Sequence, residues 1–413
     1  MSKSPEAMYD ERLKRIQDAI ALKKPDRVPV VPLFEMFPAH YAGITVHEAM
    51  TDYAKANEAW KKTILDFDPD AYLNPILAYP SRSLEALDYQ LLKLPGRDLA
   101  SDKTYQFVED EYMQAADYDA FLDDPSDYMI RTYYPRVFKA LEPFKALAPL
   151  HDGYWLGMLS VIASFSNPEL PKAFEALVKA GNEMMDWFVS LGTFDAQMKE
   201  LGYPCFNGAA TFAPFDVIGD TMRGTRGIML DMYRQPDKLL KAIERVTPWT
   251  LDMGINGAKM TGNSFVWFFL HKGIDNFMSD AQFREFYWPS LREVIVGLVD
   301  AGMTPCVYSE GRFNDRLEVL ADVPKGKVLY HFEEVDMKKA KEILGDVACI
   351  SGNVPLSLLT KGTPEQVKDY CKFLIDVVGE GGGFILDTDA VIDEANVENV
   401  RAMIDFSKEY GVY

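Results

Sequence analysis

The chain has 413 residues, of which 48% are hydrophobic, and its 43 Lys and Arg stand against 63 Asp and Glu, for a formal net charge of −20. Because the chain is strongly acidic, it repels the phosphates of nucleic acids and of anionic membranes. Neither is therefore an expected partner. The apolar content is ample for a large packed core and excludes a disordered chain.

The four cysteines, Cys205, Cys306, Cys349 and Cys371, are scattered and form no CxxC pair. This spacing excludes a disulfide scaffold and a cysteine-rich zinc module. The N-terminal residues are charged and amphipathic, without the apolar core of a signal peptide. The sequence therefore predicts a soluble, cytoplasmic protein.

Short apolar runs alternate with segments of helical period along the chain. In chain order, the expected strands are 28–34, 71–74, 204–210, 264–270, 304–309, 328–331, 348–351 and 383–387. The expected helices include 46–65, 168–200, 279–301, 313–321, 336–344, 364–378 and 396–410. Eight βα units in one chain predict an α/β fold, a single (β/α)8 barrel domain over residues 1–413. The alternative is a doubly wound open sheet, although the glycine cluster at 379–383 fails the GxGxxG pattern and precedes a strand.

Residues 79–200 are too many for one βα connection, so we expect a mostly helical insertion between strands two and three. Within it we expect a turn at 94–97, a hairpin at 104–113 and helices near 126–146 and 168–200. The acidic run 109–127 is interpreted as a solvated face rather than as a metal cluster. The insertion is expected to form a lid or a surface on which a partner docks.

Ionisable and polar residues follow nearly every predicted strand. In a barrel the C-terminal ends of the strands meet at one rim, where catalytic groups lie. The residues at or just past these ends are Glu35, His271, Tyr308, Glu310, His331, Asp387 and Asp389. Among them, Glu35, His271 and Tyr308 are the candidate catalytic residues. The alternative is structural: Glu35 would cap a backbone segment and His271 would bind a loop carbonyl.

Two arginines, Arg223 and Arg226, lie among acidic residues outside the predicted strand ends. They are suited to clamping a carboxylate or phosphate. Because Asp216, Asp220 and Asp231 are close in sequence, we expect pairing with these residues instead.

Five motifs follow one another between about residue 24 and the C-terminus. They are Lys24-Pro-Asp-Arg-Val-Pro-Val30, Ile350-Ser-Gly-Asn-Val-Pro-Leu-Ser-Leu-Leu359, Gly362-Thr-Pro-Glu365, Gly382-Gly-Phe-Ile-Leu386 and Glu398-Asn-Val-Arg-Ala-Met403. In this order they make the chain resemble the uroporphyrinogen decarboxylase-like superfamily. The resemblance implies a (β/α)8 barrel that is either a tetrapyrrole decarboxylase or a cobalamin-dependent methyltransferase.

Two departures from the superfamily's patterns bear on that choice. The segment Phe34-Glu-Met-Phe-Pro-Ala-His40 has no Arg where true decarboxylases grip the carboxylates of their substrate, so a porphyrinogen is not an expected substrate. The thiolate zinc site of the thiol-directed methyltransferases is also missing, because Tyr308-Ser-Glu310 and Ala390 stand at its positions.

The resemblance is instead to the O-demethylase type of methyltransferase, whose zinc ligands are spaced Glu-x14-Glu-x20-His. Glu310 and His331 match the second interval, whereas Ile295 stands at the first position. Glu310, His331 and Asp387 are the expected zinc ligands, three oxygen and nitrogen donors that leave a fourth position open.

The resemblance thus implies a corrinoid-dependent methyltransferase that moves a methyl group from a small molecule, such as a methoxylated substrate, to a corrinoid protein. The corrinoid-binding pattern Asp-x-His-x-x-Gly is broken by Pro38, so cobalamin is expected on the partner and not on this chain. A homodimer is a further expectation. Two alternatives stay open: a metal-free decarboxylase or lyase of a small carboxylic acid, and a non-catalytic barrel that binds a tetrapyrrole or corrinoid partner.

Overall fold

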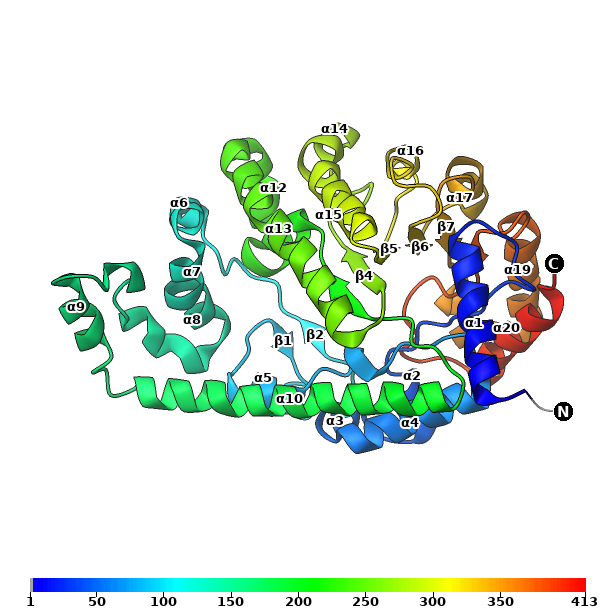
Figure 1. Ribbon diagram of the computed structural model, residues 1–413, viewed down its shortest axis with the longest axis horizontal. Helices are drawn as coiled ribbons and strands as arrows, with labels where there is room; N and C mark the ends of the chain where they lie inside the picture. Colours follow the sequence, from blue (N-terminus) through cyan, green and yellow to red (C-terminus); the bar gives the residue numbers. More distant parts are fainter. Residues whose placement is uncertain (1–2) are drawn as a thin grey trace.

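The computed structural model describes residues 3–413 and is built around a parallel sheet (Figure 1). Its six strands are hydrogen-bonded in chain order. They are β3 (Ala209–Thr211), β4 (Phe265–Leu270), β5 (Thr304–Ser309), β6 (Leu329–Phe332), β7 (Cys349–Ser351) and β8 (Phe384–Ile385). The register places Phe269 beside Tyr308, and Tyr308 beside His331.

Two extended N-terminal segments bridge the edges of this sheet. Residues 28–34 lie along β8, where the Val31 N–H donates to the Leu386 carbonyl at 3.0 Å. Residues 70–74 lie beside this first segment, and the Asp70 N–H donates a hydrogen bond to the Val30 carbonyl at 2.9 Å. Tyr72 forms a parallel bridge with Cys205, which precedes β3. These two segments and the six strands occupy eight βα positions, and the predicted α/β barrel class is confirmed.

The first two predicted strands differ from the expectation because they form single bridges and no continuous ladder. In the segment 28–34, Pro29 and Pro32 lack an N–H group and cannot donate to a neighbouring strand. The chain there keeps its extended path but makes only part of the hydrogen bonds of a regular strand.

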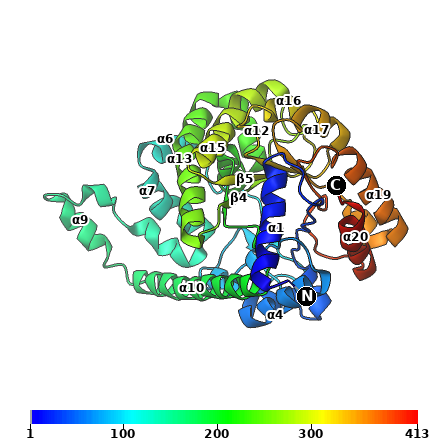
Figure 2. The ribbon, with the colours of Figure 1, turned by 45° about the vertical axis from the view of Figure 1, so that its right-hand side comes forward.

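Helices cover the outside of the sheet. Before β3, the barrel contributes α1 (Pro5–Ile20), α2 (Phe37–Ala42), α3 (Val46–Thr51) and α4 (Tyr53–Phe67). After β3 come α11 (Pro214–Asp216), η6 (Val217–Met222), α12 (Gly224–Arg234), α13 (Pro236–Thr261), α14 (Asp280–Gln282), η7 (Phe283–Tyr287), α15 (Trp288–Asp300), α16 (Leu317–Leu320), α17 (Met337–Leu344), α18 (Leu356–Lys361), α19 (Pro364–Val377) and α20 (Val397–Tyr410). Figure 2 shows the C-terminus beside α19 and α20, and the end of the chain pairs with the segment that follows α1, where the Val28 N–H donates to the Gly411 carbonyl at 2.8 Å.

Three predicted helix starts are confirmed by side-chain caps. Ser279, Thr363 and Asn396 each accept a hydrogen bond from a backbone N–H of the following turn. Such caps satisfy amides that have no partner inside the helix. The long helix α13 was not predicted; it carries Pro248 in its interior, where proline removes a helical hydrogen bond.

The insertion is mostly helical, as predicted. It follows η1 (Pro75–Leu77) and contains α5 (Ser81–Ala86), β1 (Leu92–Lys93), β2 (Gln106–Phe107), η2 (Ala115–Asp117), α6 (Tyr118–Asp123), α7 (Pro125–Tyr128), η3 (Met129–Tyr133), α8 (Tyr134–Val137), η4 (Lys139–Ala146), η5 (Leu150–Asp152), α9 (Gly157–Ser164) and α10 (Leu170–Glu200). In Figure 1, α10 runs along one side of the molecule and α9 lies at its far end.

The hairpin predicted at 104–113 is wrong. Strand β2 pairs antiparallel with β1, so its partner lies upstream of it in the chain. Beyond β2, Glu109 and Glu111 turn toward Lys272 and Arg223 and take the chain away from any second strand. The acidic run 109–127 was expected to be a solvated face, but these ion pairs of Glu109 and Glu111 show that part of the run contacts the rest of the protein.

No helix among residues 3–413 combines the length and the apolar character that crossing a bilayer requires.

Candidate active site

The alternation of side chains along the strands brings polar groups to the C-terminal end of the ring. One buried cluster inside the ring contains Leu33, Tyr308, Leu329 and Ile385, with Phe269 packed against it. Side chains of a strand point to the same face at every second residue. Two residues beyond these five positions stand Glu35, Glu310, His331, Asp387 and His271. The inner face of the ring therefore changes from apolar to ionisable toward the C-terminal ends of the strands, the end of the barrel where active sites form.

His271, directly after β4, is the centre of the first group. Its Nδ1 donates to Oδ2 of Asp220 at 2.6 Å, and its Nε2 lies 3.5 Å from Oε2 of Glu310. The side chains of His271 and Glu310 are 38% and 37% exposed, so a substrate can reach both. The structure thus brings together two of the predicted residues and adds Asp220.

Asp216 holds the backbone of this group in place. It is buried, and its carboxylate accepts the N–H groups of His271 at 3.0 Å and of Lys272 at 3.2 Å and the hydroxyl of Tyr287 at 2.6 Å. Because both amides of the turn after β4 are satisfied by one carboxylate, the orientation of His271 is set by the backbone as well as by Asp220.

Lys272 completes the charge balance of the group. Its Nζ lies 3.0 Å from Oδ1 of Asp220, 3.0 Å from Oε1 of Glu109 and 2.9 Å from Oγ1 of Thr225. Glu109 comes from the insertion and Thr225 from the start of α12, so Lys272 joins both segments to the rim.

Asp216 and Asp220 were expected to pair with arginines, and that expectation is wrong. Arg223 does pair with Asp231, and with Glu111 at 3.3 Å, which leaves the other two aspartates to His271 and Lys272. One structural signal marks this group: Asp220 lies in the π-helical turn η6 and Tyr287 in the π-helical turn η7. Such turns occur frequently at functional sites.

The charges around His271 favour its protonated form. Burial opposes the charge, but the hydrogen bond to Asp220 and the negative charges of Asp220, Asp216 and Glu310 outweigh burial and raise the pKa of His271 to about 9. Burial and the nearby Glu333 and Asp220 raise the pKa of Glu310, against the opposing charge of His271. At neutral pH, His271 is an imidazolium that can donate a proton.

Glu35 forms a second group on the same rim. The hydroxyl of Tyr105, from the insertion, donates to Oε1 of Glu35 at 2.7 Å, and the Tyr105 ring lies 4.8 Å from that of Tyr79. Burial, and then the charge of Asp393, raise the pKa of Glu35 to about 7, although the Tyr105 hydrogen bond works in the opposite direction. The insertion thus covers one side of the rim.

The Glu35→Gln variant should lose one component of the pH dependence of stability. In the folded chain the pKa of Glu35 is raised from 4.5 to about 7, so the folded state binds more protons than the unfolded state between these values. The free energy of unfolding therefore decreases as pH rises through this window, by on the order of 3 kcal/mol. Denaturant unfolding at a series of pH values should show this decrease in the native chain and a flatter profile in the variant. Identical profiles for the two proteins contradict the assignment.

Three of the predicted site residues lie below the rim, inside the ring. His331 is fully buried, with Nδ1 3.4 Å from Oδ2 of Asp387 and Nε2 3.4 Å from the Asp389 carbonyl. Asp387 also accepts the Leu33 N–H at 3.1 Å, which joins β8 to the segment 28–34. Tyr308 is buried beside His331, with ring centroids 4.4 Å apart, and donates to the Asp389 carbonyl at 3.2 Å.

The predicted zinc ligands are divided between these two levels. His331 and Asp387 are neighbours, whereas Glu310 contacts His271. Among residues 3–413, the one trio of His, Cys, Asp and Glu side chains with ligand atoms within 4.8 Å of one another is Asp216, Asp220 and His271. Within this trio Asp220 already pairs with His271 and with Lys272, and Asp216 accepts the backbone N–H groups of both residues. Glu310, His331 and Asp387 do not make up that trio, so zinc binding by these three residues stays a prediction, and the proposed chemistry uses no metal.

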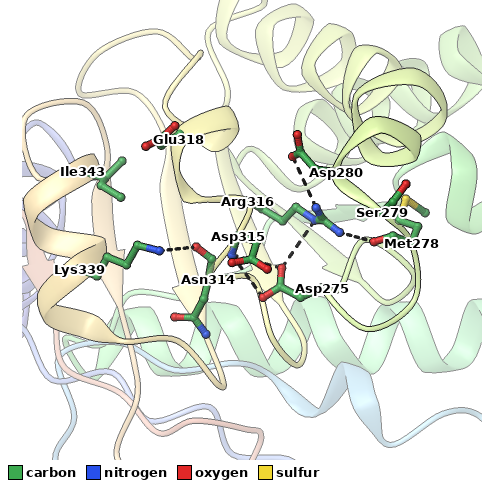
Figure 3. A pocket seen from close by; sticks show the side chains of 10 residues that line it. All are labelled: Asp275, Met278, Ser279, Asp280, Asn314, Asp315, Arg316, Glu318, Lys339 and Ile343. Atoms are coloured by element: carbon green, nitrogen blue, oxygen red, sulfur yellow. Dashed lines mark hydrogen bonds and ion pairs between the residues drawn. The ribbon is translucent and has the colours of Figure 1, made fainter.

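A cavity of about 460 Å³ lies apart from these groups, between the loops that follow β4 and β5 and helix α17 (Figure 3). Arg316 lies against it, almost fully buried, and binds the carbonyls of Gly273 and Met278. None of the predicted site residues lines this cavity.

A ring of parallel βα units with an ionisable rim is the architecture of a barrel of the enzyme type. The family model described as Uroporphyrinogen decarboxylase (URO-D) matches residues 197–410, about half of the chain. The chain belongs to the uroporphyrinogen decarboxylase family, and the resemblance stated from the sequence motifs is confirmed.

Individual relatives match only part of the chain. Uroporphyrinogen decarboxylase from Chlorobaculum parvum is 22% identical over 210 residues, which are 49% of this chain and 58% of the relative. The enzyme from Aromatoleum aromaticum is 27% identical over 186 residues, 44% of this chain and 51% of the relative. The chain thus matches a little over half the length of these curated relatives. A methyltransferase from Methanosarcina mazei shares the fold with a TM-score of 0.63 at 16% identity, over 96% of this chain and 98% of that one.

Proposed function

We propose that this protein is a methyltransferase that moves a methyl group from a small neutral molecule, such as a methyl ether, to a separate corrinoid protein. The observation that carries the proposal is the His271 side chain, partly exposed at the rim, with Nδ1 hydrogen-bonded to Asp220 at 2.6 Å and Nε2 3.5 Å from Glu310. The Methanosarcina protein that shares the fold is itself a methyltransferase, which agrees with this choice within the family.

The charges at the rim argue against a porphyrinogen substrate. A polyanion needs arginines or lysines that are free to bind carboxylates. Here Arg223 pairs with Asp231, Arg312 pairs with Glu334, and Lys272 pairs with Asp220 and Glu109. Glu35 and Glu310 would meet the substrate instead, so a neutral molecule is the better match.

The chemistry requires a proton donor at the departing oxygen. When the bond between methyl carbon and oxygen breaks, its electron pair stays on the oxygen, and the corrinoid of the partner supplies the nucleophile for the methyl group. His271 donates its Nε2 proton to that oxygen, which yields a neutral alcohol or phenol. Asp220 keeps the imidazole oriented through Nδ1, and the exposed edge of the ring regains a proton from solvent.

Methyl transfer to a corrinoid protein tests the proposal directly. Purified protein should convert cob(I)alamin on a suitable corrinoid protein to methylcobalamin when a methoxylated aromatic donor from a test panel is present, with the change followed by visible absorbance. A reaction that releases CO2 from a small carboxylic acid without any corrinoid favours the lyase alternative. Binding of a corrinoid protein without turnover favours the non-catalytic alternative.

Metal analysis tests the zinc prediction separately. The Glu310→Ala and His331→Ala variants should bind less zinc than the unchanged protein if these residues are ligands. Equal zinc contents in all three proteins contradict that assignment and leave the proposed role of His271 untouched, because that role needs no metal.

A further inference from the structure

One oxygen of the Glu35 carboxyl group is free to bind a ligand. Its Oε1 accepts the Tyr105 hydroxyl at 2.7 Å, whereas within the described residues 3–413 its Oε2 has no hydrogen bond. Glu35 is only partly buried, and Oε2 is not among the buried atoms that lack a partner, so a molecule at the rim can reach it. A carboxylate oxygen is a strong hydrogen-bond acceptor, and this one is open.

The hydrogen bond between Tyr105 and Glu35 is not needed to hold the insertion on the rim. The hydroxyl of the neighbouring Thr104 donates to the Asp393 carboxylate, and Glu109 pairs with Lys272 at 3.0 Å. These contacts fix the chain on either side of Tyr105. Burial disfavours the ionised form of Glu35 and raises its pKa, and carboxyl groups perturbed in this way cluster at functional sites.

Glu35 faces the group around Glu310 across the mouth of the ring. The segment 28–34 and β5 occupy the first and fifth of the eight positions, which are opposite each other in a ring. Glu35 and Glu310 each lie two residues beyond a side chain of the same inner cluster, Leu33 and Tyr308, so both point inward. The inside of an eight-stranded barrel holds side chains or one small ligand. One small molecule at the mouth can therefore contact both groups.

Aromatic rings from the insertion lie beside Glu35. The ring of Tyr79 lies 4.8 Å from that of Tyr105, tilted by 49°, and the ring of Phe107 meets Tyr105 edge-on at 5.8 Å. Tyr79 and Tyr105 are only partly buried, so a ligand can pack against them. Aromatic side chains around a few polar groups are typical of sites for aromatic ligands.

The charges on this side of the mouth disfavour an anionic ligand. The charges of Asp393 and Glu310 contribute to the raised pKa of Glu35. In the part of the chain that the structure describes, no Lys or Arg pairs with any of these three carboxylates; Glu310 has only His271 as a partner. A second carboxylate beside Glu35 would be repelled. A neutral hydroxyl group can instead donate a hydrogen bond to Oε2.

We propose that Glu35 and Tyr105 determine the specificity of the protein by binding a hydroxyl group of the methyl donor. The hydroxyl donates to Oε2 of Glu35, while Tyr105 holds the carboxyl group through Oε1. The ether oxygen of the same molecule lies at Nε2 of His271, on the opposite side of the mouth. The donors are therefore methoxyphenols, and methoxybenzoates are rejected by their charge. The inference rests on the proposed function for the place of the ether oxygen.

Isothermal titration calorimetry of the full chain without a corrinoid tests the hydroxyl site. The probes are the ortho, meta and para isomers of methoxyphenol, methoxybenzene, and the methoxybenzoates, at about pH 8, above the pKa of Glu35. One or more methoxyphenols should bind on the order of 10-fold more tightly than methoxybenzene, the effect of one hydrogen bond to a charged group. The methoxybenzoates should bind most weakly. Equal affinities for methoxyphenols and methoxybenzene, or no binding of any methoxyphenol, overturn the inference.

Variants assign the preference to the two residues. Glu35→Ala should bind the preferred methoxyphenol no more tightly than methoxybenzene. Glu35→Gln keeps an acceptor oxygen but loses the charge, so it should bind methoxybenzoates more tightly than the unchanged protein does. Tyr105→Phe should weaken the binding of the methoxyphenol and leave that of methoxybenzene unchanged, a difference that a general loss of structure does not produce. Glu334→Gln is the matched control, because Glu334 is an exposed carboxylate paired with Arg312, and its affinities should not change.

Methyl transfer separates this inference from the proposed function. Glu35→Ala should raise KM for the methoxyphenol about 10-fold and keep kcat, because Glu35 does not contact the departing oxygen. Binding of methoxyphenols that depends on Glu35, without any methyl transfer, supports the inference and contradicts the proposed function. Methyl transfer from a methoxyphenol with a KM that Glu35→Ala leaves unchanged supports the proposed function and overturns the inference.

Discussion

Replacing His271 by Gln should lower kcat for methyl transfer about 100- to 10,000-fold, the range that a positioned general acid contributes. Glutamine keeps the backbone N–H that Asp216 accepts and much of the side-chain volume, so the turn after β4 should remain in place. It cannot supply an acidic proton to the departing oxygen. The rate with a donor that has a good leaving group should fall less than the rate with a poor one, because the former needs less proton assistance.

The pH dependence of kcat separates this role from a merely structural one. The proposed methyl transfer needs protonated His271, whose pKa is raised to about 9, so kcat should be constant at neutral pH and should decrease above about pH 9. Asp220→Asn removes the charge and the charged hydrogen bond that raise this pKa, and the decrease should begin at lower pH. His151→Gln is the matched control, since His151 is 58% exposed on the insertion and pairs there with Asp124 and Asp152. An Asp220→Asn profile identical to that of the unchanged protein contradicts the assignment.

Replacing Asp70 by Ala should decrease the free energy of unfolding by about 3–5 kcal/mol, the cost of leaving buried charges without their partner. Asp70 is fully buried, and its carboxylate binds Arg15 at 2.7 Å, Arg27 at 2.7 Å through two nitrogens, and the Val30 N–H at 2.8 Å. The side chain of Arg15 is only 3% exposed; it loses its fully buried partner and keeps only the exposed Asp26 and Glu11. The substitution also removes a tie between the two irregular N-terminal segments of the ring.

Urea unfolding of the Asp70→Ala protein measures this effect. Asp18→Asn is the control on the same helix α1: it removes an exposed ion pair with Lys14, and such pairs contribute at most a few tenths of a kcal/mol. The midpoint should therefore shift strongly for Asp70→Ala and hardly at all for Asp18→Asn. Equal shifts would mean that the buried ion pairs do not stabilise the ring more than surface charges do.

Much of the barrel was predictable because its signals are local. Strands β4 and β5 follow from continuous apolar runs, and the starts of α14, α19 and α20 from Ser279, Thr363 and Asn396. The segment 28–34 was harder, because its apolar pattern indicates a strand while its prolines prevent a ladder. The strand β2 was assigned the wrong partner, since the pairing of β1 with β2 joins residues across an irregular loop that no periodicity describes.

The site was predictable only in part. Glu35, His271 and Glu310 were chosen because they follow strands, and the structure places all three on one rim. Asp216 and Asp220 were missed as partners of His271, because a nearby arginine offered an equally plausible partner in the sequence. Whether Asp216 and Asp220 bind an arginine or His271 depends on where α11 and η6 lie against the turn after β4.

The sequence by itself determined the eight βα positions, the family and the set of ionisable residues at the strand ends, since periodicity and strand termination are properties of neighbouring residues. Only the tertiary structure decided how that set divides. In the observed register His331 lies beside Tyr308, two residues before Glu310, so His331 is buried inside the ring next to Asp387 while Glu310 stays at the rim beside His271. The raised pKa of His271 also depends on the tertiary structure. It is caused in part by the carboxylates of Asp220 and Asp216, which are about fifty residues away in the chain and accept hydrogen bonds from His271 at 2.6 Å and 3.0 Å.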